Sequence, residues 1–310
     1  MAGVVGWRRV VFSSTGDLTR ADRVEDQGKR NSIASILETA AASVFTTLFP
    51  SDCRFCHAPL VRVSRLPVCN TCLEQIQKIE GVTCSVCGNP IVSSLAQNQD
   101  RPCCGECVSS EPLFDKAVAY GPYDGGLREL IHLLKYDGVR PAANVLGRMM
   151  SEAFLDLSPS FENGEPLIVP VPLHSSKLKQ RGFNQSELIA RAALKIVPLG
   201  RVNPELLRRT RPTETQTGLT REQRQRNIRG AFRVQHRNLI SGKDILLADD
   251  VFTTGTTVSE CARVLRKAGA KRVFVATVAR VLLAEQTGLT AVSQELGTQG
   301  AALLSRAARA

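Results

Sequence analysis

The stretch that decides the fold is residues 244–257, DILLADDVFTTGTT. It begins with a short apolar run, continues through two adjacent carboxylates at Asp249 and Asp250, and ends in a turn of threonines around Gly255. A short apolar run before a turn and a helical pattern is typical of a buried strand in a parallel α/β sheet. Because ligands of such sheets bind beyond the carboxyl ends of the strands, a binding site is expected at this turn.

The side chains of this turn suit a phosphorylated sugar. Gly255 lets the backbone approach a ligand closely, and the first amides of the following helix can hold a phosphate. We expect the loop to be exposed. Four hydroxyl donors surround the glycine: Thr253, Thr254, Thr256 and Thr257. Asp249 and Asp250 suit ribose hydroxyls, or a Mg²⁺ ion reached directly or through water. The stretch therefore predicts a site for ribose 5-phosphate, and the competing interpretation is a solvated strand end with an ordinary turn.

Nine of the ten cysteines lie between residues 53 and 107, and eight of them form four Cys-x-x-Cys pairs. Each pair can supply half of a tetrahedral zinc site, so four pairs predict two structural Zn²⁺ sites. The simplest pairing gives two sets of ligands: Cys53, Cys56, Cys69 and Cys72, and Cys84, Cys87, Cys104 and Cys107. Cys103 and His57 remain as substitutes in a variant pairing, and redox-active pairs are the competing interpretation.

Composition divides the chain into four parts. Residues 1–33 are polar and lack periodicity, which predicts a flexible tail, and residues 283–310 are predicted to form a second tail. Residues 34–112 are predicted to hold an amphipathic helix and the zinc module, and residues 113–282 an α/β domain. No apolar run approaches the roughly 18 residues that span a bilayer, and residues 1–14 lack a signal-peptide layout. We therefore expect a cytoplasmic protein without a membrane span.

Two basic segments of the α/β domain are predicted to reach the same site. Residues 127–136 form an amphipathic helix with Lys135 near its end, where the ammonium group could contact a phosphate. A short apolar strand comes later, and the basic loop after it, residues 174–185, contains Lys177 and Arg181. Because a guanidinium group binds phosphate oxygens bidentately, Arg181 is the predicted ligand for a pyrophosphate.

The chain carries a net charge of +11, from 40 Lys and Arg against 29 Asp and Glu. Residues 171–240, with 15 Lys and Arg against 4 Asp and Glu, have a net charge equal to that of the whole chain. This concentration suits phosphates or nucleic acid, although a solvated basic face gives the same pattern. Residues 206–232 are polar and rich in arginine, which predicts a mobile excursion over the site rather than a core element. A single arginine there, such as Arg209, is most simply solvated.

Residues 249–257 resemble the 5-phosphoribosyl-1-pyrophosphate (PRPP) motif of type I phosphoribosyltransferases. In that family the acidic pair holds the 2- and 3-hydroxyls of ribose, and the threonine–glycine loop holds the 5-phosphate. Together with the cysteine pairs, LRELIHLLKY at 127–136 and VPVPLHSSKLKQRGFNQ at 169–185, this motif makes the chain similar to the ComF family. The resemblance implies a type I phosphoribosyltransferase fold, a parallel sheet flanked by helices, after a double zinc ribbon. It also implies PRPP with Mg²⁺ and a link to DNA uptake and natural transformation.

Two hypotheses of different classes follow. In the first, the protein is a phosphoribosyltransferase that displaces pyrophosphate from PRPP, with Asp249, Asp250 and Arg181 as its catalytic groups. In the second, the site only senses a ribose phosphate, and the basic face and zinc module bind single-stranded DNA or proteins of DNA uptake and recombination. Aromatic residues make up only 5% of the chain, which counts against a dedicated platform for stacking bases.

Overall fold

The computed structural model describes residues 52–60, 64–91, 100–161, 164–212 and 221–282. The predicted tails and the predicted amphipathic helix lie outside these ranges. Contacts divide the chain into two compact units, residues 1–51 with 59–63 and residues 52–58 with 64–310, and all contacts discussed below lie within the second. Within the described ranges, no helix combines the length and the apolar character needed to cross a membrane.

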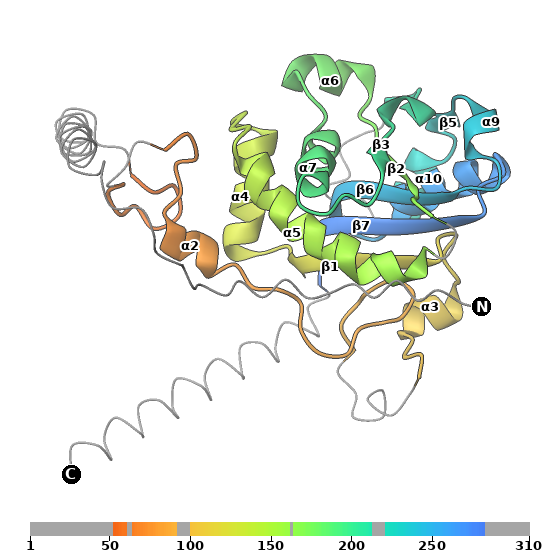
Figure 1. Cartoon of the computed structure of the whole chain (residues 1–310), viewed down its shortest axis with the longest axis horizontal. Coiled ribbons are helices and arrows are strands. Elements are labelled where there is room, and N and C mark those ends of the chain that lie inside the picture. Colours follow the sequence, from red (N-terminus) through yellow and green to blue (C-terminus); the bar gives the residue numbers. More distant parts are fainter. Residues whose placement is uncertain (1–51, 61–63, 92–99, 162–163, 213–220, 283–310) are drawn as a thin grey trace, which may run out of the picture. The chain divides into compact units, whose positions relative to one another are not determined.

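Five parallel strands form the main sheet, in the order β1–β7–β6–β2–β3. Their bounds are β1 Lys116–Pro122, β2 Leu167–Pro170, β3 Arg201–Val202, β6 Asp244–Phe252 and β7 Arg272–Arg280. Strands β6 and β7 lie side by side in the middle of the sheet (Figure 1). Nearly all of their residues are buried, as expected for strands that are covered on both faces. The buried strand predicted within residues 244–257 is therefore confirmed as β6.

Helices cover both faces of this sheet (Figure 1). Helices α4 Gly125–Lys135, α5 Ala142–Leu157 and α7 Gln185–Leu194 pack together on one face, and α10 Thr256–Lys267 lies on the other. From β1 to β2 to β3 the chain moves along the sheet in one direction, and from β6 to β7 it moves in the opposite direction. Right-handed crossovers then place the connecting helices on opposite faces. The direction of winding changes between β2 and β6, which leaves a crevice at the carboxyl ends of these two strands.

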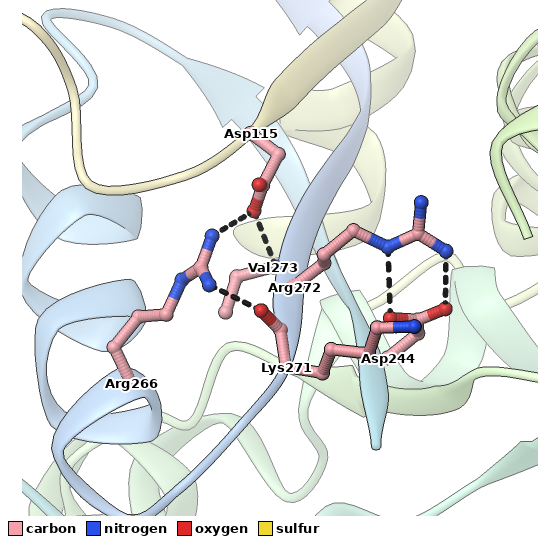
Figure 2. Close-up of polar contacts among 6 residues, drawn as sticks. All are labelled: Asp115, Asp244, Arg266, Lys271, Arg272 and Val273. Atoms are coloured by element: carbon pink, nitrogen blue, oxygen red, sulfur yellow. Dashed lines mark hydrogen bonds and ion pairs between the residues drawn. The ribbon is translucent and has the colours of Figure 1, made fainter. Parts of the chain in front are cut away.

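Polar contacts at the amino ends of β6 and β7 fix the register of the two strands (Figure 2). Arg272 donates to both carboxylate oxygens of Asp244, at 3.0 and 2.7 Å. Asp115 accepts from the backbone N–H of Val273 at 2.7 Å and forms an ion pair with Arg266 of α10. The charged groups that align the strands therefore lie at the end of the sheet opposite the crevice.

Helices α4 and α10 confirm the helices predicted at residues 127–136 and after the threonine turn, but the basic loop predicted at residues 174–185 is wrong in part. Residues Ser175–Arg181 form helix α6, which begins after His174 and ends at Gly182 with a φ of +77°. Strand β1 is an edge strand of mixed burial, and no periodic pattern predicts it. The remaining short elements are the 3-10 turns Ser158–Ser160 and Pro204–Leu206 and helix α9 Arg237–Ile240.

The described residues at both ends of the 206–232 segment contribute to the core, which corrects the prediction for them, whereas residues 213–220 of the predicted excursion lie outside the described residues. Strand β4 Leu207–Arg209 pairs antiparallel with β5 Phe232–Val234, and α8 Arg221–Ile228 lies between them in the chain. Five side chains of this segment are buried against the apolar face of α10: Leu206, Leu207, Ile228, Ala231 and Phe232. Both ends of the segment are therefore anchored to the core by apolar side chains.

The described cysteine-rich region forms two ribbons. We call residues 52–58 with 64–76, which include α2 Asn70–Glu74, the first ribbon, and residues 83–91 with 100–110, which include α3 Gly105–Ser109, the second ribbon. The second ribbon is continuous with the core of the α/β domain, because Cys84 and Cys87 lie in the same apolar cluster as β6 and α10. The N–H of Ala117 in β1 also donates to the carbonyl of Val86, at 2.7 Å.

Candidate functional site

A cavity of about 220 Å³ opens at the crevice between the carboxyl ends of β2 and β6. Its lining comes from segments that are far apart in sequence: Lys135, Val171, Pro172, Leu173, Lys177, Gln185, Arg209, Asp249, Asp250, Val251, Thr253 and Thr257. Six of these residues are predicted site residues: Lys135, Lys177, Asp249, Asp250, Thr253 and Thr257. The cavity thus gathers two carboxylates and three cationic side chains around one small space, which suits an anionic ligand that also carries hydroxyl groups or a metal ion.

The acidic pair at the end of β6 is almost completely buried, with Asp249 9% and Asp250 4% exposed. Asp249 Oδ1 accepts a hydrogen bond from Ser186 Oγ at 2.8 Å and another from the N–H of Asp250 at 3.0 Å. Asp250 Oδ2 forms an ion pair with Nζ of Lys135, at the end of α4. Buried carboxylates are costly unless they are paired, and here two of them share one ammonium group.

Because Lys135 forms an ion pair with only one of the two buried acids, the pKa values of Asp249 and Asp250 shift in opposite directions. Burial and the neighbouring charge of Asp250 raise the pKa of Asp249 to about 8. Burial also disfavours the charge of Asp250, but the ion pair with Lys135 outweighs it, so the pKa of Asp250 is lowered. Burial likewise disfavours the ammonium form of Lys135, and Asp250 outweighs it, so the pKa of Lys135 is raised. The opposite shifts favour a charged Lys135–Asp250 pair beside an Asp249 that keeps its proton to a higher pH than an ordinary aspartate.

The threonine turn leads from β6 into α10. Gly255 precedes the helix with a φ of +72°, in the left-handed region that favours glycine. A Cβ atom at this position would lie 2.7 Å from Cζ of Phe252, so both conformation and space require glycine. Thr254 Oγ1 and Thr256 Oγ1 share a hydrogen bond of 2.7 Å. Gly255 itself is buried, whereas Thr253 is exposed and the other three threonines are half-buried, so the expected exposure of the loop holds for its threonines and not for its glycine. The first amides of α10 stand at the position where helices bind anions.

The turn also borders a larger cavity, of about 640 Å³, on the side of the second ribbon. Three predicted phosphate ligands line this larger cavity and not the smaller one: Thr254, Gly255 and Thr256. Thr253 lines both cavities. Opposite the turn, the wall of the larger cavity includes Cys87, Cys107 and Arg280. The structure therefore brings the acidic pair and the turn to one region, with the turn between two hollows.

The predicted pyrophosphate ligand, Arg181, is not among the lining residues of the small cavity. Its guanidinium group donates to Gln185 Oε1 and lies over the ring of Tyr136, 5.8 Å from the centroid. Lys177, from the same helix α6, does line the cavity. Burial and the positive charge of Arg209 lower the pKa of Lys177, as expected where cationic side chains converge.

Arg209 lines the cavity although the sequence analysis treats it as solvated. Its guanidinium carbon lies 5.5 Å from the ring centroid of Phe232, and burial lowers its pKa. Strand β4 places buried Leu207 first, exposed Arg208 second and partly buried Arg209 third. This alternation of a strand is the signal that could have identified Arg209 as an inward-facing residue.

The two cysteine tetrads assemble as predicted. In each, the four sulfur atoms lie within 4.8 Å of one another: Cys53, Cys56, Cys69 and Cys72, and Cys84, Cys87, Cys104 and Cys107. Sulfur–sulfur distances of 3.9, 3.8 and 3.6 Å match the edge of about 3.8 Å that four Zn–S bonds of about 2.3 Å define. Backbone N–H groups donate to the sulfur of Cys53 and of Cys84, which is the support that thiolate ligands need. Both tetrads therefore fit Zn²⁺.

Two known domain families match this chain. The double zinc ribbon domain matches residues 44–108, and the phosphoribosyl transferase domain matches residues 184–287. Together with the parallel sheet and its helices, they define a protein with a phosphoribosyltransferase fold preceded by a cysteine-rich zinc-binding module.

Three relatives show the family more closely. "Competence protein F" of Haemophilus influenzae is 30% identical over 234 residues, which cover 75% of this chain and 98% of that protein. "DNA utilization protein YhgH" of Escherichia coli K12 is 32% identical over 239 residues, with the same two coverages. "Competence protein ComFC" of Bacillus subtilis is 26% identical over 204 residues, which cover 65% of this chain and 79% of that protein. The chain belongs to the ComF family, as the resemblance of its motifs predicted.

Proposed function

We propose that this protein binds PRPP or ribose 5-phosphate with Mg²⁺ at the carboxyl end of β6 and acts as a phosphoribosyltransferase. The observation that carries the proposal is the buried Asp249–Asp250 pair, which faces three cations across the 220 Å³ cavity and adjoins the threonine turn. The carboxylates would hold the ribose hydroxyls or Mg²⁺, and the turn would hold the 5-phosphate. Three side chains would hold the pyrophosphate: Lys135, Lys177 and Arg209. Arg181, hydrogen-bonded behind Gln185, is proposed as an outer ligand of the same group.

Lys135 would change partners when the ligand binds. In the ligand-free protein its ammonium group neutralises Asp250. A pyrophosphate would attract the same ammonium group and leave the carboxylate for ribose or metal. During transfer, the bond between C1 of ribose and the pyrophosphate oxygen breaks, and an acceptor forms the new bond to C1. Asp249 and Asp250 would stabilise the positive charge that develops on the ribose, and the three cations would stabilise the departing pyrophosphate. Mg²⁺, when bound, would neutralise pyrophosphate oxygens.

Binding of PRPP with Mg²⁺ at pH 7 is expected to release about one proton. The reason is that a ligand that needs both carboxylates ionised must remove the proton of Asp249, whose pKa is raised to about 8. Affinity should rise about tenfold per pH unit from pH 6 to pH 8, and level off above pH 8, where the free protein has already lost that proton. Calorimetric titration in buffers of different ionisation enthalpy measures both quantities.

Asp249→Asn is the control, because the amide can still accept from Ser186 and Asp250 but has no proton to release. It should bind weakly and without proton release. If the affinity of the wild-type protein for PRPP did not change between pH 6 and pH 8, the result would contradict the role of Asp249. A wild-type protein that binds neither PRPP nor ribose 5-phosphate in the presence of Mg²⁺ would overturn the proposed function as a whole.

Binding of nucleic acid is a second candidate function, supported by the arginines of the β4–β5 pair. Arg208 and Arg233 lie directly opposite each other in the antiparallel register, and both are exposed. Like charges in this position repel each other, and no ion pair joins either side chain to a residue that the structure describes. An anionic partner would relieve the repulsion. The names of the relatives, competence protein and DNA utilization protein, favour DNA as that partner.

Single-stranded DNA should therefore bind with an affinity that falls linearly with the logarithm of the salt concentration. The double variant Arg208→Ala/Arg233→Ala should reduce the slope by about 1 to 2, since two phosphate contacts are lost. The matched control is Lys243→Ala/Lys271→Ala, which removes two exposed cations at the amino end of the sheet. Fluorescence anisotropy at several salt concentrations measures the slopes. Equal slopes in the two double variants would contradict a DNA site on the β4–β5 pair.

A further inference from the structure

The second ribbon contacts the carboxyl end of β7 through one buried arginine. Arg280, the last residue of β7, is 5% exposed. Its guanidinium group donates to the carbonyl of Cys87 at 2.6 Å, to the sulfur of Cys87 at 3.6 Å and to Oδ1 of Asn89 at 3.1 Å. All three acceptors belong to the second ribbon. A guanidinium group is costly to bury unless its donors are satisfied, so the position of Arg280 depends on the folded ribbon.

The same arginine contacts the aromatic residue that supports the threonine turn. Arg280 and Phe252 are register partners at the ends of β7 and β6, and the guanidinium carbon lies 4.5 Å from the ring centroid. This distance is that of a cation–π contact. The Phe252 ring also forms a T-shaped contact with Phe114, with centroids 6.0 Å apart and planes at 89°. Arg280 and Phe114 therefore both hold the ring in place.

Phe252 in turn limits where the turn can lie. The ring is so close to Gly255 that a Cβ atom there would lie 2.7, 3.1 and 3.5 Å from three of its carbons. Gly255 is the residue from which α10 begins, and the amides that follow it are the proposed phosphate donors. A displacement of the ring would thus remove the support beneath the glycine. The contacts form a continuous series from the second tetrad through Arg280 and Phe252 to the turn.

The first ribbon has different contacts. Its neighbours in the α/β domain are β1 and α4: a Cβ atom at Gly126 would meet the Phe55 ring at 3.4 Å, and Ile79, just beyond the ribbon, donates its N–H to Tyr120. Among the described residues, no polar contact joins Cys53, Cys56, Cys69 or Cys72 to β6, β7 or the turn. The two zinc centres have the same four-cysteine ligand set, but the first ribbon contacts β1 and α4 whereas the second contacts Arg280 of β7. The first centre is therefore a matched control for the second.

We infer that Arg280 is a positioning residue through which the second zinc ribbon, and not the first, holds the threonine turn in its ligand-binding conformation. The inference rests on the proposed function for the identity of the ligand. The contact series itself does not depend on any ligand, so a measurement on the ligand-free protein can test it separately. Loss of the second zinc centre would unfold the ribbon that satisfies Arg280, and the turn would lose its support.

Four variants of the full-length chain separate the possibilities. Arg280→Met removes the donors but keeps a side chain of similar length, and Arg272→Met is its control at the opposite end of the same strand. Cys107→Ser and Cys56→Ser each remove one ligand, from the second and the first tetrad respectively. Metal analysis should give about two zinc ions per chain in both arginine variants and about one in both cysteine variants.

Hydrogen exchange of the ligand-free protein is the deciding measurement. Amides of the turn, residues 253–258, should exchange faster in Arg280→Met and Cys107→Ser than in the wild-type protein, while the amides within β6 keep their wild-type rates. In the controls Arg272→Met and Cys56→Ser, the turn amides should also keep their wild-type rates. Affinity for ribose 5-phosphate should fall about tenfold in the first two variants and stay within about twofold in the controls. Arg280→Lys, which keeps the charge, should recover part of the affinity.

The inference would be overturned if the turn amides of Arg280→Met exchanged hydrogen at the wild-type rate. It would also be overturned if the turn amides of Cys56→Ser and Cys107→Ser exchanged at the same rate. If the wild-type protein bound no ribose phosphate while turn exchange still followed Arg280 and the second tetrad, the positioning role would stand and only the proposed ligand would fall. The two failures are therefore distinguishable.

Discussion

Lys135→Met is expected to lower the free energy of unfolding by about 3–5 kcal/mol at pH 7, because it leaves the buried carboxylate of Asp250 without its cation. The pair with Asp250 lowers the pKa of the acid and raises that of the lysine. Its contribution is therefore present above the unfolded pKa of Asp, near 4, and below the unfolded pKa of Lys, near 10. The loss should shrink as the pH falls below about 4, toward the lowered pKa of Asp250. Urea unfolding at several pH values measures it.

The matched control is Lys78→Met, which breaks an exposed ion pair with Glu152 of 2.9 Å and should cost about 0–1 kcal/mol. Mg²⁺ should stabilise Lys135→Met more than the wild-type protein, because a cation at the acidic pair can then replace the missing ammonium group. Equal losses in the two lysine variants, or equal stabilisation by Mg²⁺, would show that Lys135 is not the counter-charge of the pair.

Gly255→Ala is expected to weaken binding of ribose 5-phosphate by about 100-fold, since displacement of the turn would remove several hydrogen bonds from backbone amides to a charged phosphate. It should also lower stability, because an alanine at a φ of +72° is strained and its Cβ atom meets Phe252 at 2.7 Å. Calorimetric titration with ribose 5-phosphate and thermal unfolding measure the two effects.

Gly242→Ala separates strain from contact. Gly242 has a φ of +70°, but a Cβ atom there has no neighbour within 4 Å, and the residue lies just before the amino end of β6. The substitution should cost about 1 kcal/mol of stability for the backbone alone and leave ligand affinity unchanged. If Gly255→Ala bound the ligand as tightly as Gly242→Ala, the turn would not be the phosphate site.

The parts of this structure that sequence predicts are those whose signal is local. Strand β6 is predictable because four apolar residues in succession precede the acids, and a turn and a helix follow. The zinc tetrads are predictable because the ligands of each pair are two residues apart, and the pairs themselves lie close in the chain. Lys135 is predictable as a residue of the site because it ends an amphipathic helix, and it lines the small cavity; its contact with a phosphate stays a prediction.

The parts that sequence misses depend on contacts between distant segments. The ion pair of Lys135 with Asp250 joins α4 to β6, and no spacing in the chain encodes it. Helix α6 is missed because its composition is polar and basic, so it lacks the apolar stripe that reveals other helices. Arg209 is missed because its strand has only three residues, too few for an alternation to stand out from an arginine-rich segment.

The contacts of Arg280 also constrain the order in which the chain can complete its fold. Arg280 and Cys87 are 193 residues apart in sequence, so the ribbon leaves the ribosome long before its partner is synthesised. At about 5–20 residues per second, the interval is about 10–40 s. During that time the cysteine tetrads can bind zinc, but the buried face of the second ribbon has no β7 to pack against. The support of the turn is therefore among the last native contacts that can form during biosynthesis.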